Sequence, residues 1–379
     1  PAQRYVANST DIEKAAKLLL AAKFPVIICG GGVVNSGAEQ VLENIAQLLN
    51  IPVCTTVSGQ GSLAGTHPLN AGVVGANGGV MATRDIVNSA DMVFFITCRA
   101  GSTTTENWRY PNKSIPIVHL DIDPETIGAN YPTAVGLVGD AKLTLEQLYD
   151  YLAGNIQSRT SNCVDGRAVV AKAKSAKFES FLKLANSNES PILPEKIVHT
   201  LNKLLPKDAV VCADPGTPCP YFSAYFMSDI PGRHFITNRA HGALGFAMSA
   251  AIGAAVGRPQ SKCVAVMGDG SFGFTVGELE TITRYKLPVL MIVISNSVYG
   301  WIKASQKSGY DQRYFSVDFN RTNHAKVAEA YGVRSWTVDD PLKLEAALKA
   351  AIECGEPALV DIISQPLQDA AAPVSQWMG

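Results

Sequence analysis

Short apolar runs alternate with amphipathic stretches along most of the chain. In the first part, runs of strand length are separated by segments in which apolar residues recur every three or four positions, as in helices. This alternation predicts a parallel sheet with helices on both faces. The expected strands are 25–29, 52–56, 92–97 and 115–122, and the expected helices are 11–22, 38–49, 81–88 and 143–152.

The pattern then changes and later resumes. A polar stretch and a basic helix are followed by a segment rich in Asn, Ser and Pro, which is typical of a linker. A second series of strands and helices begins near Pro194. The sequence therefore predicts an α/β protein with two doubly wound parallel-sheet domains. The expected division is 1–155 for the first domain, 156–193 for a helical linker, and 194–379 for the second domain with its C-terminal tail.

Composition narrows the classes of function. The 379 residues are 47% hydrophobic and 17% charged, which is ample for packed cores. A net charge of −1 gives no electrostatic case for binding nucleic acid or an anionic membrane. No apolar run reaches transmembrane length, and no signal-peptide pattern opens the chain. The eight cysteines lack CxxC spacing, so we expect reduced thiols and a cytoplasmic location.

One strand–helix–strand unit carries the clearest chemistry. The apolar run 264–267 ends in Gly268-Asp269-Gly270-Ser271, a helix is expected at 275–285, and a second run at 287–294 leads to Asn296. Parallel strands end at the same edge of a sheet, so Asp269 and Asn296 should meet. A carboxylate, an amide oxygen and a backbone carbonyl suit Mg²⁺ or Ca²⁺ holding a diphosphate. The small residues allow backbone N–H groups to approach phosphate oxygens.

This unit resembles the thiamine diphosphate (ThDP) signature, in which Gly-Asp-Gly is followed by a helix, a strand and an Asn pair. The resemblance implies that Asp269, the Asn296 side chain and the Val298 backbone carbonyl hold Mg²⁺. The first Asn of the usual pair is Ser295 here. Because the metal-binding position is the second of the pair, we expect the site to be retained.

Further segments extend the resemblance over nearly the whole chain. The first domain is similar to the central domain of the acetolactate synthase and pyruvate oxidase group, and the second to its diphosphate-binding domain. The segments that carry this likeness include Gly30-Gly31-Gly32, His67-Pro68-Leu69, His119-Leu120-Asp121-Ile122-Asp123, Gly242-Ala243-Leu244-Gly245 and Ala250-Ala251-Ile252-Gly253-Ala254.

The family's chemistry is ThDP- and Mg²⁺-dependent cleavage or formation of a C–C bond next to a carbonyl, usually on a 2-oxo acid, by a lyase or transferase. Within enzymes, the alternative is cleavage without decarboxylation, as in a cyclic-dione hydrolase or a 2-hydroxyacyl-CoA lyase. From another class, the alternative is a non-catalytic regulatory subunit. One departure bears on this choice: standard acetolactate synthases carry a Met where Trp301 stands and a Trp where Ser305 stands.

The resemblance also implies the residues that contact ThDP. Thr217 is the expected hydroxyl donor to the diphosphate, and Leu244 is the expected wedge that bends the cofactor; an ordinary core position is the alternative for Leu244. Tyr299 and Trp301 would face the substrate pocket or form an exposed aromatic helix. The implied cofactor-binding set is Asp214, Gly216, Thr217, Gly242, Ala243, Leu244, Gly268, Asp269, Gly270, Ser271, Asn296, Val298, Tyr299, Gly300 and Trp301.

The family's catalytic glutamate lies on a separate pyrimidine-binding domain, and nothing in this sequence matches that domain. The catalytic residue is therefore unknown here. We expect the domain to come from a partner polypeptide or from a preceding portion of a longer protein. In this family ThDP lies between two subunits, so a homo-oligomer, either a dimer or a tetramer, is expected.

A nucleotide in the first domain is a further expectation. Flavin-containing relatives bind FAD through several loops, and other relatives bind ADP or a CoA adenine there or leave the domain empty. All three outcomes stay open, because the family's Arg-Phe-Asp-Asp-Arg pattern is replaced after Arg99. The positions that match the nucleotide-binding loops are Gly30, Gly31, Gly32, Thr56, Thr97, Cys98, Arg99, Asp121, Ile122, Asp140 and Ala141.

Overall fold

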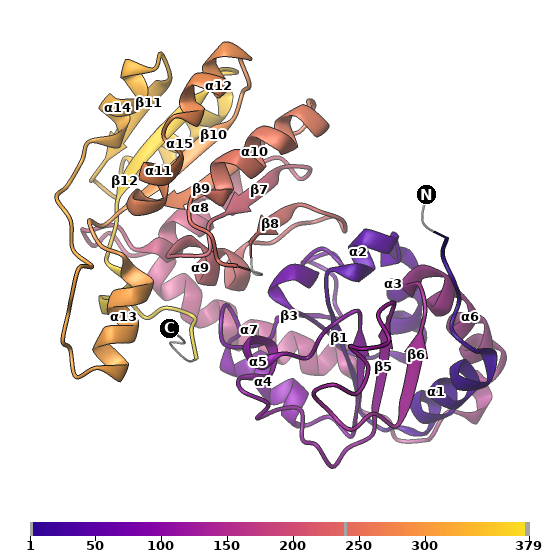
Figure 1. Ribbon diagram of the computed structural model, residues 1–379. Coiled ribbons are helices and arrows are strands. Elements are labelled where there is room, and N and C mark those ends of the chain that lie inside the picture. Colours follow the sequence, from indigo (N-terminus) through magenta and orange to yellow (C-terminus); the bar gives the residue numbers. More distant parts are fainter. Residues whose placement is uncertain (1–2, 239–240, 376–379) are drawn as a thin grey trace. The chain divides into compact units, whose positions relative to one another are not determined.

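The computed structural model describes residues 3–238 and 241–375, and the chain divides into two compact units (Figure 1). Unit 1 comprises Pro1–Phe178 and Ser228–Arg233, and unit 2 comprises Glu179–Met227 and His234–Gly379. Each unit contains a six-stranded, all-parallel sheet with helices packed on it. The predicted fold class, two doubly wound α/β domains, is confirmed.

The sheet of unit 1 has the strand order β3-β2-β1-β4-β5-β6. Its central strands are continuous apolar runs because they are buried on both faces. The order reverses between β1 and β4, and in such sheets ligands bind at this switch point. The strands are β1 (Pro25–Cys29), β2 (Val53–Thr55), β3 (Asn70–Val73), β4 (Met92–Ile96), β5 (Ile117–Asp121) and β6 (Val135–Val138).

Helices cover both faces of this sheet. Ile27 and Phe94 point into a core with α1, α3 and α6, whereas Ile28 and Phe95 pack on the other side with α4 and the start of α7. The helices are α1 (Ser9–Ala21), α2 (Gly32–Ser36), α3 (Glu39–Leu49), α4 (Met81–Asn88), α5 (Ser102–Thr105), α6 (Ala141–Gly154) and α7 (Gly166–Ala185), with short 3₁₀ turns η1 (Val57–Gly59) and η2 (Ile156–Ser158).

The sheet of unit 2 has the order β11-β12-β10-β9-β7-β8. The order in which strands are added reverses between β7 and β9, because β8 lies on one side of β7 and the later strands lie on the other. The strands are β7 (Val210–Ala213), β8 (Phe235–Thr237), β9 (Cys263–Gly268), β10 (Leu290–Ser295), β11 (Arg334–Val338) and β12 (Ala358–Ile363).

One face of this second sheet packs against α10, α11, α12 and α14 in a single apolar core. On the opposite face, α8, α9 and α15 lie against one another and against β7 and β12. The helices are α8 (Pro194–Leu204), α9 (Pro218–Tyr225), α10 (Phe246–Gly257), α11 (Asp269–Thr275), α12 (Glu278–Arg284), α13 (Gly300–Gly309), α14 (His324–Ala330) and α15 (Leu344–Glu353), followed by the 3₁₀ turn η3 (Leu367–Asp369).

One predicted element is wrong in its extent. A single helix over 275–285 was expected, but the structure has two short helices, α11 and α12, with a break at Val276 and Gly277. The first of them begins at Asp269, inside the glycine-rich turn. Leu279 and Ile282, which are three positions apart, are nevertheless both buried on the core side of α12.

Candidate cofactor and metal site

Three polar residues follow neighbouring strands at the carboxyl edge of the unit 2 sheet. Asp214 follows β7, Asp269 follows β9 and Asn296 follows β10, and these strands are adjacent in the order β7-β9-β10. The first two flank the position at which the strand order reverses. Ligands of open α/β sheets bind at such positions, so topology alone brings these side chains to one candidate site.

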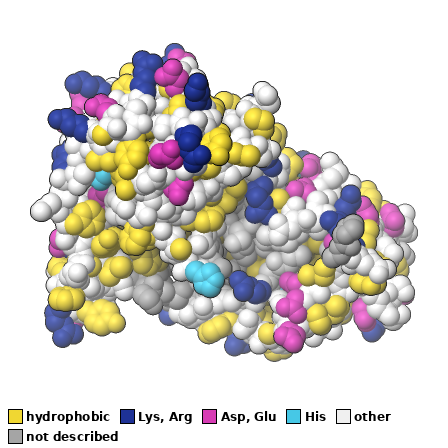
Figure 2. Space-filling model, turned by 45° about the horizontal axis from the view of Figure 1, so that its top comes forward, with side chains coloured by type: hydrophobic (Ala, Val, Ile, Leu, Met, Phe, Trp, Pro, Cys, Tyr) yellow, Lys and Arg dark blue, Asp and Glu magenta, His cyan; other side chains and the backbone are white. Residues whose placement is uncertain are grey.

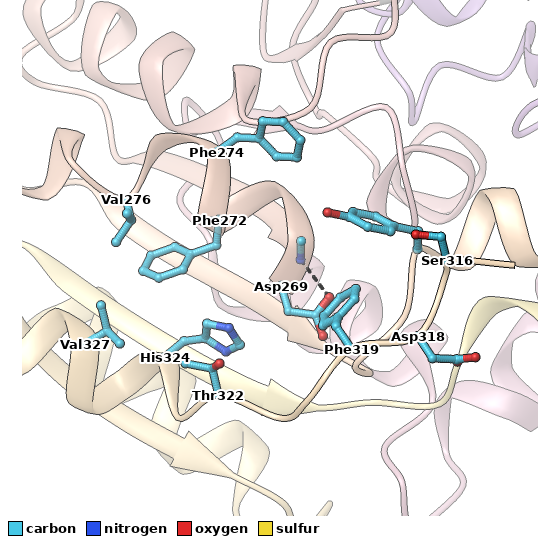
Figure 3. Close-up of a pocket in the computed structure, with 13 residues that line it drawn as sticks. Asp269, Phe272, Phe274, Val276, Ser316, Asp318, Phe319, Thr322, His324 and Val327 are labelled. Atoms are coloured by element: carbon cyan, nitrogen blue, oxygen red, sulfur yellow. Dashed lines mark hydrogen bonds between the residues drawn. The ribbon is translucent and has the colours of Figure 1, made fainter.

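Asp269 and Asn296 are in direct contact. One carboxylate oxygen of Asp269, Oδ2, accepts hydrogen bonds from the backbone N–H groups of Asn296 (2.8 Å) and Ser297 (2.6 Å). The other oxygen accepts from the N–H of Gly270 (2.8 Å), as Figure 3 shows. Burial raises the pKa of the Asp269 carboxyl above its ordinary value, and these three N–H donors partly oppose that shift. The carboxylate is therefore held in a fixed orientation at the start of α11.

The donor set fits a hard divalent cation. The predicted ligands would be the Asp269 carboxylate, the Asn296 amide oxygen and the Val298 backbone carbonyl, and these are ligand types that Mg²⁺ prefers. The Asn296 amide nitrogen is buried and has no hydrogen-bond partner, so internal bonds do not fix the direction of this amide. Residues 3–238 and 241–375 contain no group of three or more His, Cys, Asp or Glu arranged to hold a metal. A cation here would rely on one carboxylate and neutral oxygens.

Asp214 has a structural role at the same edge. It is fully buried, and its Oδ1 accepts a hydrogen bond from the backbone N–H of Ala247 in the first turn of α10 (3.0 Å). Burial raises the pKa of Asp214 to about 6. One oxygen of this carboxylate is thus used to hold the start of α10, and the contact of Asp214 with a diphosphate stays a prediction.

The two other predicted loops lie close to each other. A Cβ placed on Gly216 would stand 3.6 Å from Cδ2 of Leu244, so the Leu244 side chain reaches the loop that contains Thr217. Leu244 is half-buried, whereas Gly242 and Ala243 are exposed. Leu244 therefore has apolar surface available to a ligand, which is the arrangement that the wedge prediction requires.

Close approaches explain two glycines of the predicted set. A Cβ on Gly270 would lie 2.5 Å from Cε1 of Tyr299, and one on Gly300 would lie 2.8 Å from Cβ of Leu367 and 3.1 Å from Oγ1 of Thr217. The turn after β9, the start of α13 and the loop after β7 consequently converge. Leu367, which lies after the last strand in the expected C-terminal tail, is itself fully buried.

A cavity of about 700 Å³ opens beside Asp269 (Figure 3). It shares Asp269, Gly270 and Tyr299 with the predicted cofactor-binding residues, and aromatic and aliphatic side chains dominate the rest of its lining. Such a lining excludes water from a reacting group. The residues that line it are Asp269, Gly270, Phe272, Gly273, Phe274, Val276, Tyr299, Ser316, Asp318, Phe319, Thr322, His324 and Val327.

Helix α13 contacts the segment that follows it. The ammonium group of Lys303 donates to Oδ1 of Asp318 (2.5 Å) and lies over the ring of Tyr314. Lys303 is therefore paired within unit 2 rather than free to attract a substrate carboxylate. Trp301 is half-buried on the same helix, and Tyr299 contacts Phe319 edge to face (5.1 Å between ring centroids).

In unit 1, the residues expected to bind a nucleotide have structural explanations of their own. A Cβ on Gly30 would lie 1.9 Å from the carbonyl oxygen of Thr97, so backbone crowding alone requires glycine there. Asp121 accepts a hydrogen bond from the N–H of Asp123, and Asp140 caps α6 by accepting from the N–H of Leu143. Cys98 is buried, whereas Arg99 and Ile122 are exposed. The nucleotide stays a prediction.

Sequence reasoning missed a buried polar network beside this edge. Ser295, His324 and Asp361 contact one another through their side chains. They lie on three elements that are far apart in the sequence, and no motif links them. The one signal available was Ser295, which stands where the ThDP signature has an Asn.

Comparison with known proteins agrees with this geometry. Residues 12–148 match the family model for the central domain of thiamine pyrophosphate enzymes, and residues 214–362 match the model for their C-terminal thiamine pyrophosphate binding domain. The two matched segments fall in unit 1 and unit 2, and the second contains every polar residue of the candidate site. The chain belongs to the thiamine pyrophosphate enzymes.

Its relatives are acetolactate synthase large subunits. A probable acetolactate synthase large subunit of Methanococcus aeolicus is 34% identical over 370 residues, which cover 95% of this chain and 61% of the relative. One from Methanocaldococcus jannaschii is 33% identical, with 96% and 61% covered. The acetolactate synthase isozyme 3 large subunit of Escherichia coli is 31% identical over 344 residues, with 90% and 59% covered.

The chain thus spans about three fifths of the length of these relatives. Among the helices that the structure describes, none has both the length and the apolar character needed to cross a membrane.

Proposed function

We propose that this chain holds the diphosphate end of ThDP, through Mg²⁺, in an enzyme that forms or cleaves a C–C bond on a 2-oxo acid. The observation that carries the proposal is the contact between Asp269 and Asn296, which follow β9 and β10 at the carboxyl edge of the unit 2 sheet. The match of 214–362 to the thiamine pyrophosphate binding domain supports it. The names of the relatives, acetolactate synthase large subunits, support carboligation as the reaction.

The residues of this chain would divide the work of binding. Asp269, Asn296 and the Val298 carbonyl would hold the metal, and Thr217 would donate to the diphosphate. Leu244 would support the bent cofactor. When bound, ThDP supplies a thiazolium electron sink for the bond next to the carbonyl. Tyr299 and the apolar cavity residues would orient the substrate and exclude water.

The general acid–base group would come from outside this chain. We propose that a pyrimidine-binding domain, in a partner polypeptide or in a further portion of the protein, supplies the catalytic glutamate, and that the active enzyme is a homo-oligomer. Exposed apolar side chains on unit 2 are consistent with such a covering partner. They include Phe274, Ile302, Tyr310, Tyr314 and Phe315.

Surface charge gives no competing reason to propose nucleic acid as a partner. On the face that Figure 2 shows, Lys and Arg side chains are interspersed with Asp and Glu rather than gathered in one area. The net charge of the chain is −1. A groove that binds nucleic acid would need a continuous basic surface.

Titration of ThDP into the protein with Mg²⁺ present, followed by calorimetry, tests the binding half of the proposal. We expect Asp269→Ala to abolish Mg²⁺-dependent binding, because the metal loses its only charged ligand. Asp208→Ala, which removes an exposed carboxylate of the same unit, should bind as the wild type does. Unchanged binding by Asp269→Ala would show that the metal assignment is wrong.

The reaction half needs the complete enzyme. We expect release of CO₂ from pyruvate or another simple 2-oxo acid. If none of these acids releases CO₂, cleavage without decarboxylation, as in a cyclic-dione hydrolase or 2-hydroxyacyl-CoA lyase, becomes the better proposal. The departures at Trp301 and Ser305 from standard acetolactate synthases make this comparison worth making. Binding of ThDP without any turnover would instead favour a regulatory subunit.

A further inference from the structure

One buried carboxylate in unit 2 connects two residues that are far apart in the sequence. Asp361 lies on β12 and is fully buried. Its Oδ1 accepts a hydrogen bond from the hydroxyl of Ser295, the last residue of β10 (2.5 Å). Its Oδ2 accepts from the backbone N–H of His324, the first residue of α14 (3.1 Å).

The imidazole of His324 completes the network. Its Nδ1 lies 3.0 Å from Oγ of Ser295 and 3.4 Å from Oδ1 of Asp361. Because the Ser295 hydroxyl proton is directed at the carboxylate, Nδ1–H can donate to a lone pair of Oγ. Both Ser295 and His324 are buried, so the loss of either donor would leave a buried carboxylate less well satisfied.

Ser295 and His324 stand directly before and directly after one segment of the chain, residues 296–323. This segment leaves the sheet after Ser295 and ends at His324, the first residue of α14, which packs against β11 and β12. This excursion carries Asn296, the Val298 carbonyl and Tyr299, which are the groups proposed to face the metal and cofactor. Both of its ends are therefore attached to the same Asp361 side chain.

Two further contacts connect the network to the metal site itself. Ser295 directly precedes Asn296, whose N–H donates to the Asp269 carboxylate. On the other side, the ring of Phe272 meets the ring of His324 edge to face, with 5.3 Å between centroids. Phe272 belongs to α11, the helix that begins with Asp269, and Figure 3 shows both rings beside the cavity.

We propose that Ser295, His324 and Asp361 are positioning residues that hold the 296–323 excursion in the conformation that binds Mg²⁺ and ThDP. The proposal rests on the proposed function of this site. Partners that orient the ligands of a metal, without touching it, commonly change metal affinity by about 10- to 100-fold when they are removed. The Ser295 hydroxyl would thus be needed because it holds the backbone in place directly before Asn296, a proposed metal ligand.

Ser295→Ala tests this proposal, and Ser364→Ala is its matched control. Ser364 is also a buried serine at the same edge of the sheet, directly after β12, but its hydroxyl donates to the carbonyl of Ile192 (2.7 Å), outside the network. Each variant removes one buried hydroxyl donor, but Ser295→Ala also removes the acceptor beside Nδ1 of His324, so it should lose at least as much stability as Ser364→Ala. Only Ser295→Ala should weaken Mg²⁺-dependent ThDP binding by the assembled enzyme, by roughly 10-fold or more.

Hydrogen exchange of the protein without cofactor provides a second readout. We expect Ser295→Ala to speed exchange in 297–323 and Ser364→Ala to leave that segment unchanged. Ser295→Thr keeps the hydroxyl and should restore both binding and protection. Asp361→Asn, where it folds, should resemble Ser295→Ala.

The outcomes separate this inference from the proposed function. Wild-type affinity and wild-type exchange in Ser295→Ala would overturn the positioning role. Equal weakening of binding in both serine variants would also overturn it, because a general loss of stability would then explain the effect. Failure of the wild-type enzyme to bind ThDP would reject the proposed function, while the exchange comparison would still decide whether the network holds the excursion.

Discussion

The Asp214 carboxylate accepts a hydrogen bond from the Ala247 amide, at 3.0 Å, and so joins the loop after β7 to the first turn of α10. The first N–H groups of a helix have no partner within it, and a side-chain acceptor there stabilises the helix. We expect Asp214→Ala to lower the free energy of unfolding by about 1–2 kcal/mol. Asp214→Asn, which keeps an oxygen acceptor, should lose less. Urea denaturation of both variants measures the difference, and equal losses would contradict the capping role.

Gly270 is expected to tolerate no side chain. A Cβ there would lie 2.5 Å from the Tyr299 ring, so Gly270→Ala must displace that ring or the turn itself. We expect a loss of about 1–3 kcal/mol in stability, together with weaker ThDP binding. Gly273→Ala, on the same helix, meets no atom within 4 Å and should be neutral or stabilising by up to about 1 kcal/mol. Thermal unfolding of the pair tests this, and similar behaviour of both variants would contradict it.

Glu195 should make stability depend on pH. This residue is buried near the start of α8, and burial raises its pKa to about 7. The folded protein therefore binds the proton more tightly than the unfolded chain, in which the carboxyl has its ordinary pKa of 4.5. The contribution of protonated Glu195 to the free energy of unfolding is fully present below pH 4.5 and is lost as the pH rises through about 7.

Glu195→Gln removes this titration, so its stability relative to the wild type should rise between pH 5 and 8, by an amount on the order of 3 kcal/mol. Chemical denaturation at several pH values measures the difference between the two proteins. That difference cancels the contributions of other buried carboxyls, such as Asp214. A difference that does not change with pH would contradict the raised pKa.

The ion pair between Arg84 and Glu106 should be essential to the stability of unit 1. Glu106 is buried, and its Oε1 accepts from both Nη2 (2.7 Å) and Nε (3.2 Å) of Arg84. Arg84→Ala would leave that carboxylate without its counter-charge, at a cost of about 3–5 kcal/mol. The exposed pair of Arg284 and Glu280 is the control, since solvent screens it. Arg284→Ala should change little, and equal effects in the two variants would contradict the burial argument.

The central strands were the easiest elements to predict, because burial on both faces makes each of them a continuous apolar run. The short strands β3 and β6 were missed, because neither is such a run. Pro25–Cys29 was predicted to the residue, as was the helix Met81–Asn88. The helix expected over 275–285 was wrong because apolar periodicity reports which side is buried and not whether the backbone is continuous. Val276 and Leu279 follow the helical period, yet α12 begins only after Gly277.

The site divides in the same way. Topology was enough to predict that Asp269 and Asn296 meet, because parallel strands end at one edge. The contacts of Ser295 with Asp361 and His324 could not be predicted, since they depend on where two later elements place their side chains. Asp214 lies after β7, next to the turn that contains Asp269, as the alternation of strands predicts, but its partner, an amide of α10, is a tertiary contact that no local pattern encodes.

The buried cysteines offer a way to follow the unfolding of this protein. Three thiols are buried in each unit, and burial raises the pKa of several of them to about 12, which makes them inert in the folded state. They are Cys29, Cys54 and Cys98 in unit 1 and Cys212, Cys219 and Cys263 in unit 2. A thiol reagent would first reach Cys163 and Cys354, which are partly exposed. The buried cysteines react only after the unit that contains them unfolds. The order in which the thiols of unit 1 and unit 2 are labelled therefore tells whether the two units unfold together or one after the other.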